Sequence, residues 1–597
     1  MTSTVYNSNP FSIQTPEEIS AQDAHSLFVN VFSDFPKLLN EGHTFIHGPR
    51  GSGKSMMFRY MQPDCQCLEH ECTVSDLPFY GVYIPIKNTG LHITEMSRLT
   101  DTYVNGMLNE HFMCTYIANK TFASVSTAVS NNRPEWRNEI RQFALDSFAR
   151  LMRQSGWSKT FPDLGTIDDV SDIFRHLASI CDDAFKEALR YVRKLTFKKE
   201  LPEYDGPLCG YFDFLHPILR DLKGLVFMPD GPVYLMIDDA DNLSYTQTLI
   251  LNSWVASRTS SDISLKISTQ LNYKTFLTVT KQYINAPHDY NDVNISAVYT
   301  TSYKTKYRDR VRAIIERRLK LANIDATPET FFPNYALQER KIDELKEKLR
   351  QNWELEKRSY RPEDDAVRYA RPEYMRTLAG KSKSLSTYSY SGFEQLVHIS
   401  SGLIRFFLEP ASIMFSDEQT RTGTAKILHI SPAIQNEVIR RQANEFMFGE
   451  IEKLQKEQGQ ESAYYVKVKR LNSIIHALGA TFREILFSEQ RRERRVFSIA
   501  FSDEPDDEVR EVLDFGVVFG FFHLTSIGNK EGTGRTRLYV LTRRLAPFFG
   551  LDPTGFAGYL FITNSQIKEV MYTGKTLRKI QQESATSIEQ FELPFGD

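Results

Sequence analysis

Gly48-Pro49-Arg50-Gly51-Ser52-Gly53-Lys54-Ser55 is the stretch that decides the fold of this 597-residue chain. It fits the pattern G-x-x-x-x-G-K-[ST], in which backbone N–H groups of a glycine-rich loop surround phosphate groups. The apolar residues 44–46 before it predict a short buried strand, and the apolar residues 56–58 after it predict a helix. Because a strand, a loop and a helix in this order are the context that the pattern requires, the sequence favours a phosphate-binding loop over an ordinary glycine-rich turn.

The residue types in this loop each suit a part of a bound nucleotide. A helix that begins near Gly53 directs the positive end of its dipole at the phosphates. The ammonium group of Lys54 offsets the charge of the β- and γ-phosphates, and the hydroxyl of Ser55 is a ligand for Mg²⁺. The sequence therefore predicts ATP and Mg²⁺ as ligands, with nucleotide contacts from Gly48, Arg50, Gly51, Ser52, Gly53, Lys54, Ser55 and Met56.

The composition is typical of a globular protein with several domains. Hydrophobic residues make up 41% and charged residues 25% of a chain several times longer than one domain. The formal net charge of −3 excludes a strongly basic surface over the whole molecule. The first residues show no signal pattern, and the longest apolar stretch, residues 515–522, is too short to span a bilayer. We therefore expect a cytoplasmic protein with no membrane partner.

Six cysteines in a chain of this length do not form a disulfide framework. Three of them and a histidine cluster after the loop, at Cys65, Cys67, His70 and Cys72. Their spacing is tighter than that of the usual zinc ligand pairs, so reduced thiols in a turn are favoured over a zinc site.

A second apolar run, residues 233–237, ends in Asp238-Asp239-Ala240-Asp241. By itself this run fits a plain junction between a strand and a turn. Downstream of a phosphate-binding loop, it also fits the acidic strand end of a nucleotide hydrolase. In that interpretation Asp238 orients Mg²⁺ through the water of the ion, and Asp239 is the base that polarises the attacking water.

Other apolar runs predict the rest of a parallel sheet. Residues 79–86 and 263–267 are expected to be buried strands, and residues 294–299 a fifth strand. The run 263–267 is followed by Ser268-Thr269-Gln270, where a polar side chain can contact the γ-phosphate or the attacking water. Polar residues also end most strands, so an ordinary strand end is the alternative.

A large helical insertion is expected at about residues 95–225, between the loop and the acidic strand. Apolar residues recur there at helical spacing, in Phe174, Leu177, Cys181 and Phe185 and again in Leu145, Phe148 and Met152. These stripes are most simply faces that pack into a core. A surface that recognises a partner and a purely structural addition are both consistent with this segment.

The next informative segment is residues 398–405, where a Ser-Gly turn opens a helix that carries Arg405. Arginine stays charged and grips phosphate through two donors, so Arg405 is predicted to act as a phosphate sensor on a helical lid. An ordinary helix start is the alternative. A charge-rich stretch, residues 338–365, precedes it and is expected to be a solvated helix outside the lid.

The C-terminal third changes in pattern. A strand at 496–501, a helix at 508–522 and two strands at 523–527 and 536–541 are expected, and the last two flank the tip Asn529-Lys530-Glu531-Gly532-Thr533-Gly534-Arg535. Helices followed by a hairpin with a basic tip are typical of a winged helix. Such tips contact nucleic acid through Lys and Arg, and winged helices also serve as protein docking domains.

The final residues, Gln590-Phe591-Glu592-Leu593-Pro594-Phe595-Gly596-Asp597, are similar to a short peptide of the kind that binds a sliding clamp. Short patterns of this sort also occur by accident. A tail that docks on its own domain, or on nothing, is the favoured interpretation.

In this order, these elements resemble an AAA+ ATPase of the origin-recognition initiator type, a group related to the STAND signalling ATPases. The start Asn9-Pro10-Phe11 is similar to that of such chains. The resemblance covers the loop, the acidic strand and the lid well, the C-terminal segment moderately and the insertion not at all. It implies a five-stranded parallel sheet, ATP bound between core and lid, and homo-oligomers joined by an arginine from a neighbouring subunit.

The resemblance is nearest to the initiator-like ATPases of bacterial anti-phage defence operons, which act with separate effector proteins. The implied fold class is α/β, a P-loop AAA+ core with a helical insertion, a helical lid and a C-terminal winged-helix domain. The expected boundaries are 1–320 for the core, 321–450 for the lid with its charged insertion, 451–560 for the winged-helix-like domain and 561–597 for the tail.

The chain departs from the family pattern at Asp239, where these ATPases usually carry Glu. Asp is one methylene shorter, and because a misplacement of 1 Å can cost roughly a hundredfold in rate, slow turnover is expected. An Asp-Asp pair also occurs in STAND ATPases, which use the nucleotide as a conformational latch. The arginine supplied to a neighbour is not obvious, and Arg258 and Arg308 are the leading candidates.

Three functions are consistent with the sequence. The first is an ATP-dependent switch in a defence complex that controls a separate effector. The second is a DNA-binding initiator of replication or plasmid maintenance, with the winged helix as its reader. The third is a nucleotide-locked scaffold with little turnover.

Overall fold

The structure is a computed structural model whose described residues are 9–12, 15–16, 18–30, 35–87, 89–99, 101–129, 134–162, 167–194, 203–257, 262–270, 273–295, 304–355, 362–379, 388–424, 426–456, 462–488, 495–528, 535–554 and 558–577. The chain divides into two compact units. The sheet unit contains residues 14–296, and the C-terminal unit contains residues 1–13 and 297–597. No helix within the described ranges combines the length and the apolar character that crossing a bilayer requires.

The sheet unit is built on a five-stranded sheet whose described strand pairs are all parallel. The strand order is β2–β3–β4–β1–β5, and the strands are β1 (Thr44–His47), β2 (Tyr80–Pro85), β3 (Val233–Asp238), β4 (Ile263–Thr269) and β5 (Asn291–Asn294). The strands β1, β3 and β4 are buried at every position, as expected of strands covered on both faces. The predicted five-stranded parallel sheet is confirmed.

The edge strand β5 begins earlier in the chain than predicted. The sequence indicated residues 294–299, whereas the strand covers Asn291–Asn294, and residues 296–300 lie outside the described ranges. Of its four residues only Val293 is buried, because β5 lies at the edge of the sheet and pairs with β1 alone. A strand with one buried residue has no apolar run that a sequence pattern could detect.

Side chains alternate along β3 and join two different cores. Tyr234 and Met236 pack with residues of α2 and α3 on one face of the sheet. Leu235 and Ile237 pack with α5 and α10 on the other face. The helices of this unit are α1 (Ala21–Leu27), α2 (Phe35–Leu39), α3 (Lys54–Tyr60), α4 (Pro63–His70), α5 (Thr102–Ala128), α6 (Arg137–Gln142), α7 (Ala149–Gln154), α8 (Val170–Lys194), α9 (His216–Lys223) and α10 (Tyr245–Ala256).

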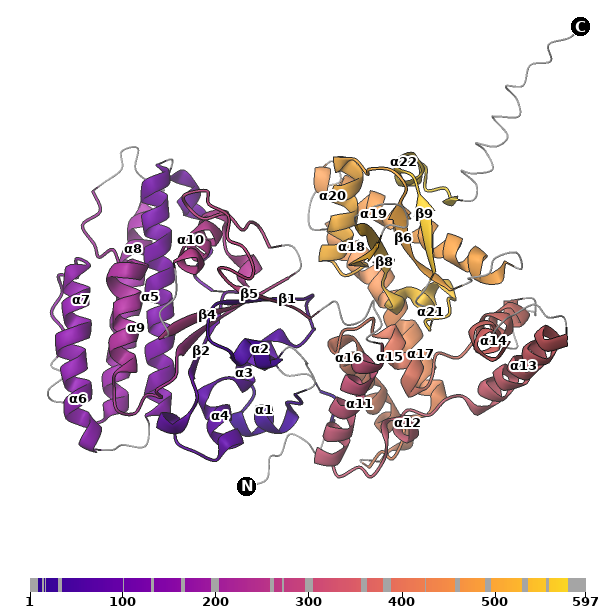
Figure 1. Cartoon of the computed structure of the whole chain (residues 1–597), viewed down its shortest axis with the longest axis horizontal. Helices are drawn as coiled ribbons and strands as arrows, with labels where there is room; N and C mark the ends of the chain where they lie inside the picture. The colour runs from indigo at the N-terminus through magenta and orange to yellow at the C-terminus, as the bar shows by residue number, and fades with distance from the viewer. Residues whose placement is uncertain are drawn as a thin grey trace, which may run out of the picture. The chain divides into compact units, whose positions relative to one another are not determined.

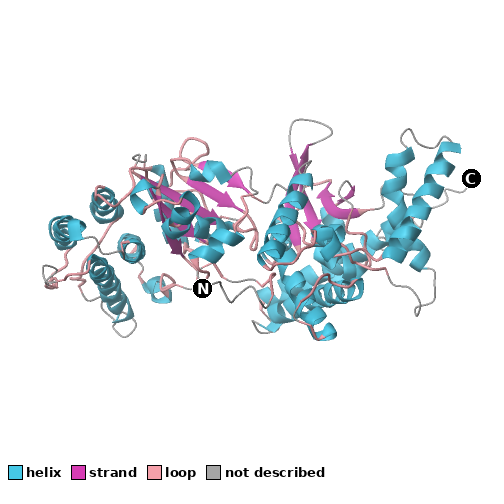
Figure 2. Cartoon of the chain, turned by 90° about the horizontal axis from the view of Figure 1, so that it is seen from below, coloured by secondary structure: helices cyan, strands magenta, loops and turns pink. Residues whose placement is uncertain are grey.

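The helices α5 to α9 occupy the predicted insertion and run side by side. Figure 1 shows their long axes roughly parallel, and Figure 2, turned by 90°, shows several of them end-on. Helix α5 contacts both β2 and α8, so the bundle continues the core of the sheet outward. In α8, Phe174, Leu177 and Cys181 are fully buried, as the helical spacing predicted, and Phe185 is half-buried against the same core.

The second predicted stripe is wrong at Leu145, whose side chain is 50% exposed, whereas Phe148 and Met152 are fully buried. The cause is a π-helical turn at Phe143–Phe148 between α6 and α7. Leu145 lies inside this turn, and the extra residue of a π turn shifts its side chain around the helix axis relative to an α-helical pattern.

The C-terminal unit has one continuous core, which also takes in the start of the chain. Phe11 is fully buried against Phe331, Phe332 and Phe415, and the amide Nδ2 of Asn9 donates to the backbone oxygen of Ser412 at 2.8 Å. The main helices are α11 (Lys304–Leu321), α12 (Pro328–Phe331), α15 (Phe393–Ile399), α16 (Arg405–Thr422), α17 (Pro432–Asn444), α18 (Glu450–Lys456) and α19 (Ala463–Phe487). The division after residue 296 puts α11 in this unit, whereas the sequence grouped it with the core.

The charge-rich stretch, residues 338–365, lies in two helices, α13 (Ala336–Leu355) and the start of α14 (Pro362–Ala379). The stretch is not solvated throughout, because Ile342 of α13 is buried in the core of this unit. The two helices pack on each other and extend away from the rest of their unit (Figure 1). The rings of Trp353 and Tyr369 contact with centroids 5.1 Å apart.

The last part of the C-terminal unit contains a four-stranded sheet in the order β7–β8–β6–β9. Its elements are β6 (Val496–Phe501), α20 (Asp507–Val518), β7 (Phe522–Gly528), β8 (Arg535–Leu541), α21 (Ala546–Phe549), β9 (Gly558–Ile562) and α22 (Asn564–Thr573). The strands β7 and β8 form an antiparallel hairpin that extends to the pair Gly528 and Arg535. The predicted tip, residues 529–535, lies outside the described ranges except for Arg535, so the winged helix stays a prediction. The predicted tail, residues 561–597, instead begins with the end of β9 and with α22, because Ile562, Ile567 and Val570 are buried in the core of this unit. The clamp-binding peptide lies outside the described ranges and stays a prediction.

Candidate functional site

The glycine-rich loop connects the end of β1 to the start of α3 in a tight turn. Gly51 and Gly53 have φ angles of 82° and 100°, which residues with a Cβ rarely adopt. The backbone N–H of Gly48 donates to the oxygen of Thr269 at 3.1 Å, which ties the loop to β4. A Cβ on Gly48 would lie 3.0 Å from the hydroxyl of Ser52, so a larger residue would crowd this side chain.

The side chain of Lys54 lies inside this loop. Its Nζ donates to the oxygen of Gly48 at 2.6 Å and to that of Pro49 at 3.2 Å. An ammonium group has three N–H donors, so one donor remains for a phosphate oxygen. Burial lowers the pKa of Lys54, and the carboxylates of Asp238 and Asp239 oppose this shift. The lysine is therefore a buried cation whose charge is supported by the acids at the end of β3.

The other predicted loop residues differ in exposure. Arg50 is exposed, and Ser55 and Met56 are half-buried. Ser52 is buried, and its hydroxyl has no hydrogen-bond partner among the described residues. A buried hydroxyl without a partner is costly, and a phosphate oxygen in the loop would satisfy it. The residues present thus fit a phosphate group.

Asp238 ends β3 and its carboxylate is held from three directions. Oδ2 accepts from the hydroxyl of Tyr83 at 2.9 Å, and Oδ1 accepts from the backbone N–H of Asp239 at 3.1 Å. The hydroxyl of Ser268 also donates to Oδ1. Because a carboxylate has about four lone-pair positions, one is left, on Oδ2, for a water bound to a metal ion. This geometry suits an indirect Mg²⁺ contact.

The neighbouring Asp239 has a left-handed backbone with φ 54° and ψ 44°. Its N–H also donates to the hydroxyl of Ser268 at 3.0 Å, and no hydrogen bond joins its carboxylate to another described side chain. Asp and Asn adopt left-handed angles more readily than other residues with a side chain. The backbone therefore gives a physical reason for Asp rather than Glu at this position.

The carboxylate of Asp239 is poised to titrate near neutral pH. Its pKa is raised from 3.8 to about 6, chiefly by burial and also by the charges of Asp238 and Asp241. Lys54 and Arg50 oppose the shift. A base with a pKa near the working pH is well matched to proton abstraction.

The residues at the end of β4 hold the acidic pair and the loop in place. Ser268 and Thr269 are fully buried, and Thr269 shares a hydrogen bond of 2.9 Å with Nδ1 of His47. The amide of Gln270 donates to Asp241 at 2.9 Å. The hydroxyls of Ser268 and Thr269 thus form hydrogen bonds with other groups of the protein. Their contact with the γ-phosphate or the attacking water stays a prediction.

Because β1, β3 and β4 are adjacent and parallel, their carboxyl ends meet at one edge of the sheet. This edge brings together the phosphate loop, the acidic pair and the Ser268–Thr269 pair, which lie far apart in the sequence. The arrangement combines a phosphate cradle, a buried cation and a carboxylate that can take up a proton.

Arg405 belongs to the C-terminal unit, where it is exposed at the start of α16. The turn before it contains Ser401 and Gly402 with φ angles of 53° and 83°. The hydroxyl of Ser401 accepts from the backbone N–H of Arg543 at 2.8 Å, so the short helical turn Arg543–Leu545 that follows β8 fixes this turn. The phosphate contact of Arg405 stays a prediction.

The two candidates for the arginine supplied to a neighbour have different surroundings. Arg258 lies outside the described ranges. Arg308 is on α11, and its Nε lies 2.5 Å from Oε1 of Glu394. An arginine held in such an ion pair would have to exchange partners to reach another subunit.

The cysteine cluster does not converge on one point. Cys65 is buried and its thiol contacts Ala21 of α1, whereas Cys67 and Cys72 line a separate cavity. Within the described residues, no group of three or more His, Cys, Asp or Glu side chains is arranged to hold a metal ion. Each of the six thiols is unpaired by disulfide.

Sequence reasoning missed Tyr83 and His47. His47 directly precedes the loop, and its Nε2 lies 3.3 Å from Oδ1 of Asp292 on β5. Its place next to the loop was a usable signal. Tyr83 is a strand residue in an apolar run, and nothing in the run distinguishes it from a core tyrosine. Only the pairing of β2 with β3 brings it to Asp238.

The family model described as ORC-CDC6-like matches residues 9–363 and 345–562. Together these ranges include the phosphate loop, the acidic pair, Arg405 and the β7–β8 hairpin. No curated protein matches the chain.

Proposed function

The chain belongs to the ORC-CDC6-like family, and from this premise we propose that it binds ATP with Mg²⁺ and hydrolyses it as an AAA+ switch. The observation that carries the proposal is the common edge where Lys54 faces the carboxylates of Asp238 and Asp239. A buried lysine beside a loop of glycines fits a triphosphate, and a carboxylate with a raised pKa fits the activation of water.

In this proposal the loop binds the phosphates through its backbone N–H groups and the hydroxyl of Ser52. Lys54 uses its remaining N–H on a β- or γ-phosphate oxygen while it continues to hold the loop through Gly48 and Pro49. Arg50, exposed at the loop, adds a charge at the outer side of the phosphates. These contacts fix the triphosphate at the edge of the sheet.

Ser55 and Asp238 would hold Mg²⁺, which supplies neutralisation of the phosphate charge when bound. Two side chains of the protein position Asp238 for this role. Tyr83 and Ser268 both donate to Asp238, so its carboxylate is fixed in orientation.

Asp239 would take the proton of the attacking water on its carboxylate. With a pKa of about 6 it is mostly ionised at pH 7 and is still basic enough to accept a proton. Ser268 holds the Asp239 backbone through its hydroxyl, which limits the positions of the carboxylate. Because the side chain is short, we expect slow turnover, and a nucleotide-locked scaffold is the limiting case.

We further propose that Arg405 reads the bound phosphate and that copies of the chain assemble. Support for the first point is the exposed position of Arg405 after a turn that is fixed by Ser401 and Arg543. Assembly, with Arg258 or Arg308 supplied to a neighbour, follows from the family. Control of a separate effector in anti-phage defence rests on the sequence resemblance and is tested by the neighbouring genes. An adjacent nuclease, reverse transcriptase, protease or deaminase would favour it.

A DNA-binding initiator is a second candidate that one observation favours. Arg535 and Arg537 are exposed on β8, and as residues i and i+2 they lie on one face of the hairpin that leads to the basic tip. An origin repeat beside the gene would favour this function over defence.

The proposed activity is tested by phosphate release from ATP with Mg²⁺, with and without DNA. We expect slow release in the wild-type chain and reduced release in Arg405→Ala. Lys426→Ala is the control, because Lys426 is exposed in the same unit. Absence of release under every condition, with ATP still bound, would leave the scaffold as the function.

A further inference from the structure

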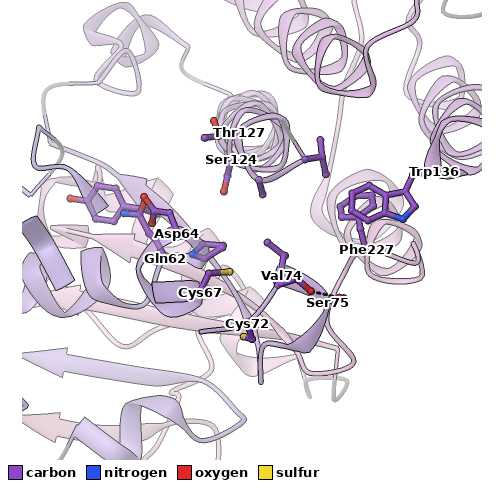
Figure 3. Close-up of a pocket in the computed structure, with 15 residues that line it drawn as sticks. Gln62, Asp64, Cys67, Cys72, Val74, Ser75, Ser124, Thr127, Trp136 and Phe227 are labelled. Carbon is purple, nitrogen blue, oxygen red and sulfur yellow. Dashed lines mark hydrogen bonds between the residues drawn. The ribbon is translucent and has the colours of Figure 1, made fainter. Parts of the chain in front are cut away.

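The sheet unit contains a cavity of 520 Å³ that the ATPase site does not use. It lies beside the edge strand β2, between α4 with its following segment 72–75 and the C-terminal end of α5 (Figure 3). Its volume falls in the range of roughly 300–1,000 Å³ typical of sites for small molecules.

The lining differs between the two ends of the cavity. Figure 3 shows Trp136 and Phe227 at one end and Gln62 at the other, with Cys67 and Val74 between them. The rings of Trp136 and Phe227 have centroids 5.5 Å apart and an interplanar angle of 39°. Together they offer an aromatic surface at this end.

The charges around the cavity are already balanced. No Lys, Arg or His is among the described lining residues, so a phosphate or carboxylate would find no cation there. The single carboxylate, Asp64, accepts from both terminal nitrogens of Arg59, at 2.8 Å and 2.9 Å. An anion would be desolvated without a partner, and a cation would compete with Arg59 for Asp64.

Hydrogen-bonding capacity remains at the Gln62 end. The side-chain amide of Gln62 has no hydrogen bond to any described residue, and it offers two donors and an acceptor. The hydroxyl of Ser124 shares one hydrogen bond of 3.1 Å with Tyr80 and keeps a lone pair for another partner. A ligand with an amide-like group would match this end.

We propose that this cavity binds an uncharged, elongated small molecule, with an aromatic end against Trp136 and Phe227 and an amide or hydroxyl group at Gln62. The binding itself does not depend on the proposed ATPase function. The aromatic contacts select a flat apolar group, and the lack of a free charge among the described lining residues selects against ionic compounds.

The cavity is joined to the nucleotide site by two side chains in its lining. The hydroxyl of Tyr83 donates to Asp238, the proposed Mg²⁺ contact, at 2.9 Å. Asp64 holds Arg59, which lies on the helix that follows the phosphate loop. A molecule that shifts either side chain would change the ATP site, so the ligand is expected to regulate it. This coupling rests on the proposed function.

A charge series with one shared ring system tests the binding. Indole-3-acetamide is neutral, tryptamine is a cation and indole-3-acetate is an anion, and each is added to the full chain without nucleotide. Binding is measured by saturation-transfer NMR and by the shift in melting temperature. We expect indole-3-acetamide to bind at least tenfold more tightly than either ionic analogue. Equal binding of all three, or of none, would overturn the proposal.

Two variants locate the bound molecule. Trp136→Ala should weaken indole-3-acetamide at least tenfold, whereas Trp353→Ala, which removes a tryptophan from α13 in the other unit, should have no effect. Because Trp136→Ala removes a core contact, Gln62→Leu is the second variant. The side chain of Gln62 makes no capping hydrogen bond to α4, so the variant should fold normally while its affinity for indole-3-acetamide falls. If both cavity variants bind indole-3-acetamide with unchanged affinity, the assignment of the binding site to this cavity is wrong.

The coupling has its own readout. In the wild-type chain indole-3-acetamide should change the affinity for ATP with Mg²⁺ by threefold or more, and in Tyr83→Phe it should bind as before without that change. Equal ATP affinity with and without the compound in the wild-type chain would overturn the regulation but leave the binding site intact. Failure of ATP to bind at all would instead overturn the proposed function.

Discussion

The backbone N–H of Asp239 donates to the hydroxyl of Ser268 at 3.0 Å, and the same hydroxyl donates to Asp238. One serine at the end of β4 therefore positions both acidic residues at the end of β3. This bridge holds Asp239 in its left-handed conformation, which costs roughly 1 kcal/mol without such support. The positions of Asp238 and Asp239 therefore depend on the neighbouring strand β4 as much as on β3, the strand at whose end they lie.

Removal of this bridge should affect hydrolysis more than binding. In Ser268→Ala, Asp238 loses a donor and Asp239 loses an acceptor, and one lost hydrogen bond of this kind is worth about 1–1.5 kcal/mol. We expect kcat to fall about tenfold with little change in the affinity for ATP. Ser268→Thr keeps the hydroxyl and should recover activity. An equal loss in Ser268→Thr would mean that the hydroxyl is not responsible.

The buried cation should dominate ATP affinity. Lys54→Ala removes a charge-assisted hydrogen bond to phosphate, worth about 2–3 kcal/mol, and should weaken ATP by roughly 30- to 150-fold. The affinity is measured with a fluorescent ATP analogue at equilibrium. Lys87→Ala, which changes an exposed lysine of the same unit, is the control. Wild-type affinity in Lys54→Ala would contradict the assignment of the loop.

The raised pKa of Asp239 predicts a penalty in stability. Its folded-state pKa of about 6 lies above the ordinary 3.8, so the folded chain holds more protons than the unfolded chain between pH 4 and pH 6. The free energy of unfolding therefore falls as pH rises through this window. Asp239→Asn keeps a residue that tolerates left-handed angles and removes the charge.

At pH 7.5 we expect Asp239→Asn to be more stable than the wild-type chain by roughly 1 kcal/mol, after allowance for solvent screening of a half-buried group. The corresponding rise in melting temperature is about 2 °C. The difference should vanish below about pH 3, where Asp239 is protonated in both states. A stability difference that does not depend on pH would show that the charge is not its cause.

The β7–β8 hairpin should contact DNA if the chain is an initiator. Replacement of Arg535 and Arg537 by Ala should weaken binding and reduce the slope of log K against log salt by about two, because each contact with a phosphate contributes roughly 0.9. Lys469→Ala on α19 is the control, since Lys469 is exposed in the same unit. An unchanged slope would assign the hairpin to protein docking.

The sequence predicted those parts of the site that are continuous in the chain. The loop follows from the glycine pattern, and β2, β3 and β4 follow from apolar runs, because buried parallel strands are apolar on both faces. The strand β5 was misplaced because its pairing with β1, and not its hydropathy, defines it. Leu145 was misassigned because a π turn breaks the helical period.

The sequence contains no pattern that predicts contacts between strands that lie far apart in the chain. The bonds from Tyr83 and Ser268 to Asp238 depend on the register of β2, β3 and β4. The left-handed angles of Asp239 likewise arise from the turn that follows β3. These features give a physical reason for Asp at position 239. The sequence pattern alone showed only that this residue differs from the Glu that is usual in the ATPases that the chain resembles.

The central claim is that the loop and the acidic pair form one ATP site in which Lys54 binds and Asp239 activates water. Its most direct test is a single-turnover experiment with radiolabelled ATP and Mg²⁺, in which bound and cleaved nucleotide are counted in the same sample. The account predicts that Asp239→Asn binds ATP with wild-type affinity and cleaves it at least a hundredfold more slowly. Cleavage at the wild-type rate by Asp239→Asn would contradict it.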